Sequence, residues 1–200
     1  MKSTHPFEPY IPADSEKLII GTIPPPRFCK EPYQLYENDV NFYYGSRDNY
    51  FWGILEEVFE RKLDYSNTEQ AVQQRKDLLK ELKIGITDIV DSCLHNGGSA
   101  KDSDLKDIEY KDIKSLLQKY PAIDTLIYTS EFVKKLMNKH FGTSHSIVDP
   151  SNRKKQSVKI GGKEYQVKIL YSPSPLALIN LGNGGAEKRK EQYLEFLTKD

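Results

Sequence analysis

An aromatic segment with a polar turn inside it, residues 42–52, is the part of the chain best suited to chemistry. Six of its eleven residues are aromatic, and the interrupting residues 45–49, Gly-Ser-Arg-Asp-Asn, are typical of a turn. Aromatic rings offer stacking area at low entropic cost, and the side-chain amide of Asn49 can orient a planar heterocycle through hydrogen bonds. We therefore expect an aromatic-lined pocket here and not a buried strand.

Two proline-rich turns are predicted to position this segment. Residues 17–21 form a short apolar run that predicts a buried strand, and Gly21-Thr22-Ile23-Pro24-Pro25-Pro26 must leave that strand as a rigid loop because proline cannot continue a sheet. A second strand, over 164–171, ends in Ser172-Pro173-Ser174-Pro175. Ligands of parallel α/β sheets bind beyond the carboxyl ends of the strands, so both turns should meet at one crevice.

Helices alternate with strands along the rest of the chain. Apolar spacing predicts helices over 51–59, 68–82, 110–120, 131–140 and 186–197. The first, second and fourth of these have candidate caps in Asp48 or Asn49, Asn67 or Thr68, and Thr129 or Ser130. A strand is expected over 123–128, and residues 84–90 are either a strand or an extended segment that leads into a turn over 88–93. A polar loop is expected over 94–104, and a hairpin in which Gly161-Gly162 joins 157–160 to 164–171. This order predicts a layered α/β fold with a mostly parallel sheet.

Composition restricts the class of protein. Two hundred residues fit a single domain over 1–200, in which 1–16 form an extended lead-in. With 29 basic and 29 acidic residues, the chain is not expected to coat nucleic acid through bulk charge, although Lys and Arg cluster at 153–155 and 188–190. Cys29 and Cys93 are too few for a cysteine zinc or iron–sulfur site, so free thiols are expected. We expect a soluble, cytoplasmic monomer with no cofactor or metal.

Taken in order, the motifs resemble those of the uracil-DNA glycosylase superfamily, most closely its mismatch-specific thymine/uracil and hypoxanthine branches. The resemblance rests on Gly21-Thr22-Ile23-Pro24, on residues 44–52, on Ser172-Pro173-Ser174-Pro175, and on 85–93, which is similar to the middle segment of the hypoxanthine branch. It implies a three-layer αβα sandwich with a short, mostly parallel central sheet. It also implies a repair enzyme that flips a deaminated base out of DNA and hydrolyses its N-glycosidic bond.

The same resemblance implies a role for each matching residue. It makes Asn49 the catalytic residue, which hydrogen-bonds the base or holds the attacking water. It gives Tyr44 the stacking role and places Thr22, Ile23 and Phe28 at the base. In the second motif, Ser172 and Ser174 would grip phosphate, and Leu176 would enter the vacated stack as a wedge. The residues by themselves leave plainer roles open: core packing for Tyr44 and Phe28, a helix cap for Asn49, turn residues for the serines and a loop anchor for Leu176.

Position 23 departs from the family pattern, which has an asparagine or a carboxylate there. Isoleucine can neither accept a proton nor orient water, so we expect Asn49 to supply the polar catalytic group. Two alternatives stay open: a nucleic-acid-binding module that has kept the fold and lost the activity, and a hydrolase of free nucleosides or nucleotides. Other candidates are interpreted as structural, namely Asp88 and Asp91 as solvated or capping carboxylates, and His140 and His145 as surface or capping residues.

Overall fold

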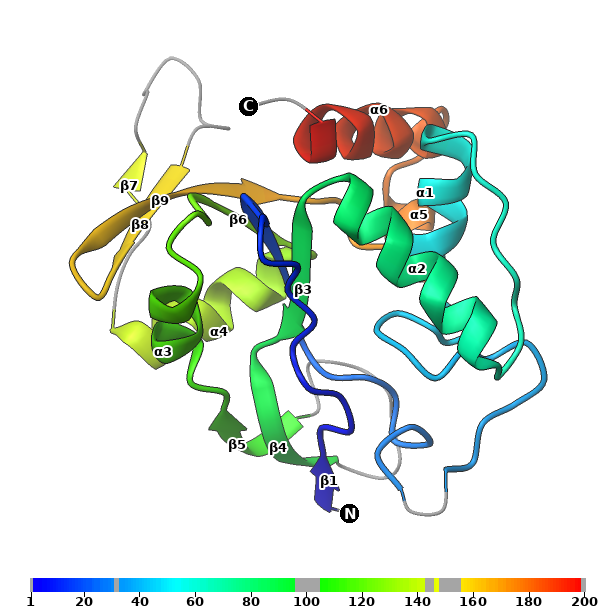
Figure 1. The fold of residues 1–200 in the computed structure, drawn as a ribbon, viewed down its shortest axis with the longest axis horizontal. Helices are drawn as coiled ribbons and strands as arrows, with labels where there is room; N and C mark the ends of the chain where they lie inside the picture. Colours follow the sequence, from blue (N-terminus) through cyan, green and yellow to red (C-terminus); the bar gives the residue numbers. More distant parts are fainter. Residues whose placement is uncertain (1, 31–32, 96–104, 143–145, 148–155, 199–200) are drawn as a thin grey trace.

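A six-stranded sheet forms the centre of the computed structural model, which describes residues 2–30, 33–95, 105–142, 146–147 and 156–198. Its strand order is β3-β2-β6-β9-β8-β7 (Figure 1). The strands are β2 (Lys17–Gly21), β3 (Ile84–Asp88), β6 (Thr125–Tyr128), β7 (Ser146–Ile147), β8 (Gln156–Ile160) and β9 (Lys163–Ile169). β3, β2, β6 and β9 run parallel, whereas β8 and β7 add an antiparallel edge. The predicted mostly parallel sheet is confirmed.

Helices cover both faces of this sheet. Figure 1 shows α1 (Phe51–Val58), α2 (Glu69–Glu81) and α6 (Gly185–Thr198) on one side and α3 (Ile113–Lys119) and α4 (Glu131–Phe141) on the other. Side chains of a strand alternate between faces, and β2 shows this directly: Ile19 packs into the core under α1, α2 and α6, while Leu18 and Ile20 pack against α3 and α4. The fold is therefore the predicted three-layer αβα arrangement.

A second, antiparallel sheet was not expected from the sequence. It contains β1 (Lys2–Thr4), β4 (Val90–His95) and β5 (Leu105–Tyr110), in the order β1-β4-β5. The lead-in is thus more than an extended tail, because its strand β1 pairs with β4 and Tyr10 bridges to Ile86. These pairings join residues more than seventy positions apart, which local sequence patterns do not report.

Several boundaries differ from the predictions. The helix expected from residue 110 begins only at Ile113, with the Asp112 side chain as its cap, because the residues before it belong to β5. Residues 94–95 of the expected polar loop belong to β4, and 96–104 lie outside the described residues, as do His145 and 153–155. No helix in the described ranges has the length and apolar character needed to cross a membrane.

The turn and cap chemistry was predicted more accurately. Thr68 caps α2 and Ser130 caps α4, each accepting a backbone N–H with its side-chain oxygen. Gly161 and Gly162 form the hairpin turn with φ of 59° and 91°. At α1 the cap position is Tyr50, one residue beyond the expected Asp48 or Asn49. A short helix absent from the predictions, α5 (Pro175–Asn180), follows the second proline-rich turn.

Candidate active site

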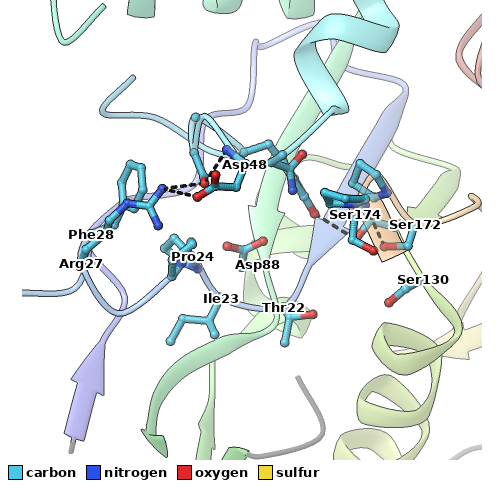
Figure 2. A pocket seen from close by; sticks show the side chains of 18 of the residues that line it. Thr22, Ile23, Pro24, Arg27, Phe28, Asp48, Asp88, Ser130, Ser172 and Ser174 are labelled. Atoms are coloured by element: carbon cyan, nitrogen blue, oxygen red, sulfur yellow. Dashed lines mark hydrogen bonds and ion pairs between the residues drawn. The ribbon is translucent and has the colours of Figure 1, made fainter. Parts of the chain in front are cut away.

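The two proline-rich turns and the aromatic turn line one pocket of about 480 Å³. The pocket opens beyond the carboxyl ends of β2, β3, β6 and β9, where open α/β sheets bind ligands. Figure 2 shows Thr22, Ile23 and Pro24 on one side of it and Ser172 and Ser174 on the other. The lining residues are Thr22–Pro25, Arg27, Phe28, Phe42, Tyr44–Ser46, Asp48, Asn49, Asp88, His95, Thr129, Ser130 and Ser172–Leu176. The expected convergence of the two turns is therefore confirmed.

A backbone hydrogen bond fastens the aromatic turn to the second proline-rich turn. The N–H of Tyr50 donates to the carbonyl of Pro173 at 3.1 Å. The residue that opens α1 is thereby held against the turn that follows β9. The spacing of the two loops is set by a main-chain contact, which does not depend on the identity of either side chain.

Asn49 begins the helix and faces the pocket at the same time. Its side-chain oxygen accepts the backbone N–H of Phe51 at 2.8 Å, a bond that supports the first turn of α1. The half-buried side chain also lines the pocket. The bond to Phe51 uses one lone pair of Oδ1 and leaves the NH₂ group, a donor of two hydrogen bonds, for a ligand. The capping and ligand-facing interpretations of Asn49 are thus compatible.

Tyr44 is fixed at both ends. Its ring stacks on Phe51, with centroids 4.5 Å apart and planes at 27°, and its hydroxyl donates to Oγ1 of Thr129 at 2.9 Å. Its backbone has φ of 55°, in the left-handed region that is uncommon outside glycine. The ring combines core packing with a place in the pocket lining, so its stacking on a base remains a prediction.

Gly21 allows the pocket floor to form. A Cβ at this position would lie 2.0 Å from the Tyr44 hydroxyl and 2.2 Å from Oδ1 of Asp88. No side chain other than hydrogen fits between these two groups. The glycine that ends β2 is therefore needed for close approach and not only for the turn.

The remaining residues that were expected at the base are apolar or enclosed. Thr22 and Phe28 are buried, with only 1% of Phe28 exposed, whereas Ile23 is half-buried. Phe28 packs edge-on against Phe7 and beneath the Arg27 guanidinium. Their contacts with a base stay predictions, and the exposure of Phe28 fits core packing better than stacking.

An ion pair between Arg27 and Asp39 stabilises the side of the pocket that Arg27 and Ser46 line. Arg27 donates to both carboxylate oxygens of Asp39, at 2.7 and 2.9 Å, and to Oγ of Ser46 at 2.7 Å. The fully buried Asp39 carboxylate also accepts the backbone N–H groups of Arg47 and Tyr36, both at 2.8 Å. Burial alone would raise the pKa of Asp39, but these hydrogen bonds outweigh it and lower the pKa.

Asp88 is the candidate site residue that sequence analysis missed. It was interpreted as solvated or capping, yet only 5% of it is exposed, and Figure 2 shows its carboxylate in the middle of the pocket. Nε2 of His5 lies 2.8 Å from its Oδ2. Asp91, its expected companion, is exposed. The sequence did hold a signal for this position of Asp88, because the residue lies near the end of the segment over 84–90. In the structure it ends β3 and pairs in register with Gly21, which ends the neighbouring parallel strand β2.

The cysteines are free, as expected, and Cys29 lies beside the Pro24 turn. Its thiol donates to the Pro24 carbonyl at 3.6 Å. Burial, chiefly, raises the pKa of this thiol to about 12, so it is not a nucleophile at neutral pH. Within the part of the chain that the structure describes, no group of three or more His, Cys, Asp or Glu side chains is arranged to hold a metal ion.

The turn after β9 carries the residues predicted to meet DNA. Oγ of Ser172 accepts the N–H of Ser174 at 3.3 Å, and Oγ of Ser174 accepts the N–H of Ala177 at 3.2 Å, which caps α5. Leu176 lies in this helix and is 62% exposed, so it is not an anchor packed into the core. The turn interpretation of the serines is correct, and contact with phosphate remains a prediction.

Comparison with solved structures finds this fold elsewhere. A solution NMR structure described as a putative uracil DNA glycosylase from Methanosarcina acetivorans superposes with a TM-score of 0.60, at 18% sequence identity, over 98% of this chain and 99% of that chain. No protein-family model and no curated protein sequence matches the chain. At this identity the likeness is one of fold, and the chain has the three-layer α/β fold of that structure along nearly its whole length.

Proposed function

We propose that this protein is a DNA glycosylase of the uracil-DNA glycosylase superfamily, which hydrolyses the N-glycosidic bond of a deaminated base flipped out of DNA. The observation that carries the proposal is the pocket itself, in which an amide donor, Asn49, and a carboxylate acceptor, Asp88, lie among aromatic and proline side chains at the carboxyl end of the sheet. The fold shared with the Methanosarcina structure supports it.

The polar groups of the pocket complement the edge of a deaminated base. Uracil and hypoxanthine both present a carbonyl next to a ring N–H, whereas cytosine and adenine present an amino group next to a bare ring nitrogen. The NH₂ of Asn49 suits the carbonyl, and the Asp88 carboxylate suits the N–H. Such a donor–acceptor pair can bind either uracil or hypoxanthine. Its hydrogen-bonding pattern does not match cytosine or adenine, the bases from which they form.

Catalysis in this proposal depends on the departing base. As the glycosidic bond breaks, the sugar gains oxocarbenium character and the base gains negative charge, so a donor aimed at the base carbonyl lowers the barrier. Asn49 supplies that donor because its oxygen is held by Phe51. Ile23 cannot hold a water, so leaving-group stabilisation has to supply most of the rate enhancement. Tyr44 stacks on the base, and Thr22 and Phe28 close the pocket around it.

DNA contact is assigned to the turn after β9. Ser172 and Ser174 accept backbone N–H groups through their oxygens, so the proton of each hydroxyl can be donated to a phosphate oxygen. Leu176, exposed at the rim of the pocket, is suited to occupy the space that the flipped nucleotide leaves. The protein acts as a monomer in this proposal.

The direct test is base excision from oligonucleotides. Labelled single- and double-stranded DNA containing one uracil or one hypoxanthine is incubated with the protein and then treated with alkali, which breaks the strand at an abasic site. We expect cleavage at the lesion and none in the matched cytosine or adenine strand.

Two other outcomes point to the alternative functions. Salt-dependent DNA binding with no cleavage at stoichiometric protein would indicate the binding module, for which the half-buried Ile23 is the supporting feature. Release of the base from free nucleosides as readily as from DNA would indicate a nucleoside hydrolase.

A further inference from the structure

His5 contacts the pocket-lining residue Asp88, although it belongs to the lead-in. Its side chain is fully buried, and Nε2 is 2.8 Å from Oδ2 of Asp88, a carboxylate that is 7% exposed. The two residues are 83 positions apart in the sequence. Strand β1 ends at Thr4 and pairs with β4, which starts two residues after Asp88, so the second sheet brings the imidazole to the carboxylate.

The two ring nitrogens of His5 have contacts of different kinds. Nδ1 of His5 receives the backbone N–H of Phe7 at 3.1 Å and faces Nζ of Lys111 at 3.1 Å. Lys111 also donates to the carbonyl of Phe7 at 2.8 Å, the oxygen that lies 2.9 Å from Nδ1. An ionised carboxylate only accepts, so the contact with Oδ2 of Asp88 requires a proton on Nε2. Lys111 and the N–H of Phe7 suit an acceptor at Nδ1, whereas the carbonyl of Phe7 suits a donor there.

The second carboxylate oxygen lies at the pocket floor. Oδ2 is held by His5, whereas Oδ1 lies against Gly21 and near the Tyr44 hydroxyl, where no room is left for a Cβ, and the Asp88 side chain lines the pocket. Lys111 supplies the nearby positive charge. Burial lowers the pKa of its ammonium group, and the charges of Asp88, Asp91 and Glu8 oppose that effect. A buried carboxylate needs such partners to stay ionised and in one rotamer.

We propose that His5 is a positioning residue of the active site: it donates its Nε2–H to Asp88 and so fixes the carboxylate that accepts the ring N–H of the bound base. This inference rests on the proposed function and adds to it a part of the chain, residues 2–5, that would otherwise be interpreted as a dispensable lead-in. Because the hydrogen bond acts through Asp88, its contribution to the rate must depend on the carboxylate being present.

A double-mutant cycle tests that dependence. In His5→Leu, which keeps bulk and removes the donor, single-turnover base excision is expected to fall by about tenfold to hundredfold, the cost of one hydrogen bond to a charged group. His5→Gln, whose amide N–H can reach the same oxygen, should recover most of the rate. In an Asp88→Asn background, His5→Leu should cause little further loss. His140→Leu, at a histidine that packs on Tyr110 away from the pocket, is the matched control and should leave the rate unchanged.

The outcomes separate this inference from the proposed function. Equal loss in both backgrounds, accompanied by a lower unfolding midpoint, would overturn it in favour of a structural role. Imidazole ¹⁵N shifts of the wild-type protein provide a readout independent of activity, and an Nε2 without a proton would also overturn it. If the wild-type protein excises no base, the proposed function fails, and the ¹⁵N shifts alone then decide whether His5 donates to Asp88. Should His5→Leu not fold, the ¹⁵N measurement on the wild-type protein decides whether His5 donates to Asp88.

Discussion

The two walls of the pocket differ in how firmly they are held. The wall formed by residues 21–49 is fastened by the Arg27–Asp39 ion pair, by the Tyr44–Thr129 hydrogen bond and by stacking on Phe51. The wall formed by Ser172–Leu176 leads into α5, a helix with no buried residue. One wall is part of the core, and the other stands at the surface.

This difference fits two different tasks. Base recognition and leaving-group stabilisation require donors and acceptors held in place before the substrate arrives, because reorganising them during the reaction costs rate. Contact with a DNA backbone tolerates more freedom, since phosphate contacts position the duplex without reading its sequence. Substitutions in the first wall should therefore affect chemistry or stability, and substitutions in the second should affect only the use of duplex DNA.

The largest effect is expected for Asn49→Ala in the first wall. Losing a donor to developing negative charge should slow excision by about 100- to 1,000-fold in single-turnover assays. Asn49→Asp is the informative partner, because it keeps the acceptor for Phe51 N–H and loses the NH₂ group. We expect Asn49→Asp to retain the thermal midpoint and lose the activity. Wild-type activity in Asn49→Asp would reduce Asn49 to a helix-starting residue.

Gly21→Ala should rank second, because the new methyl group would collide with both Tyr44 and Asp88. The added bulk should lower the free energy of unfolding by about 1–3 kcal/mol. It should also reduce excision, since both displaced groups line the pocket. Gly53→Ala, within α1 and 3.8 Å from the nearest atom, is the control and should stabilise the protein slightly. Unchanged excision by Gly21→Ala would show that the floor is not preorganised.

Asp39→Asn should change stability more than chemistry. Breaking a buried ion pair on one side leaves the other charge uncompensated, and we expect a loss of about 3 kcal/mol in urea unfolding at pH 7. Arg27→Lys, which keeps the charge but not the two-pronged geometry, should lose less. If fully folded Asp39→Asn excised the base as slowly as Asn49→Ala, this separation of stability from chemistry would be wrong.

The same carboxylate predicts a pH dependence. Because the pKa of Asp39 is lowered in the folded protein, its contribution to stability is present above the unfolded value of about 4 and is lost as pH falls through the folded value. Unfolding measured between pH 7 and pH 3 should therefore show a shallower loss of stability in Asp39→Asn than in the wild-type protein. Parallel curves would indicate that the ion pair does not control acid sensitivity.

The smallest effect is expected in the second wall, for Leu176→Ala. An exposed side chain contributes within about 0.5 kcal/mol to folding, so the midpoint should not move. Excision from duplex DNA should fall, while excision from single strands, which need no wedge, should not. Ile179→Ala, on the same helix, 74% exposed and not among the residues that line the pocket, is the matched control. Equal effects of both substitutions on duplex excision would remove the wedge role from Leu176.

Residues with strong local preferences were predicted well. The apolar run of β2, the hairpin at Gly161-Gly162 and the caps Thr68 and Ser130 follow from backbone and side-chain chemistry within a few residues. The meeting of the two proline-rich turns also followed from sequence, because parallel strands bring their carboxyl ends to one edge of the sheet.

The sequence alone therefore determined the alternation of helices with the parallel strands of the main sheet and the edge of that sheet at which the pocket lies. Only the tertiary structure decided that Asp88 is buried in the pocket, that Arg27 pairs with Asp39, and that His5 comes from the lead-in to meet the carboxylate. The physical reason is distance along the chain: capping, turn and alternation signals act between near neighbours, whereas the environment of an ionisable side chain depends on segments that pack together only after folding.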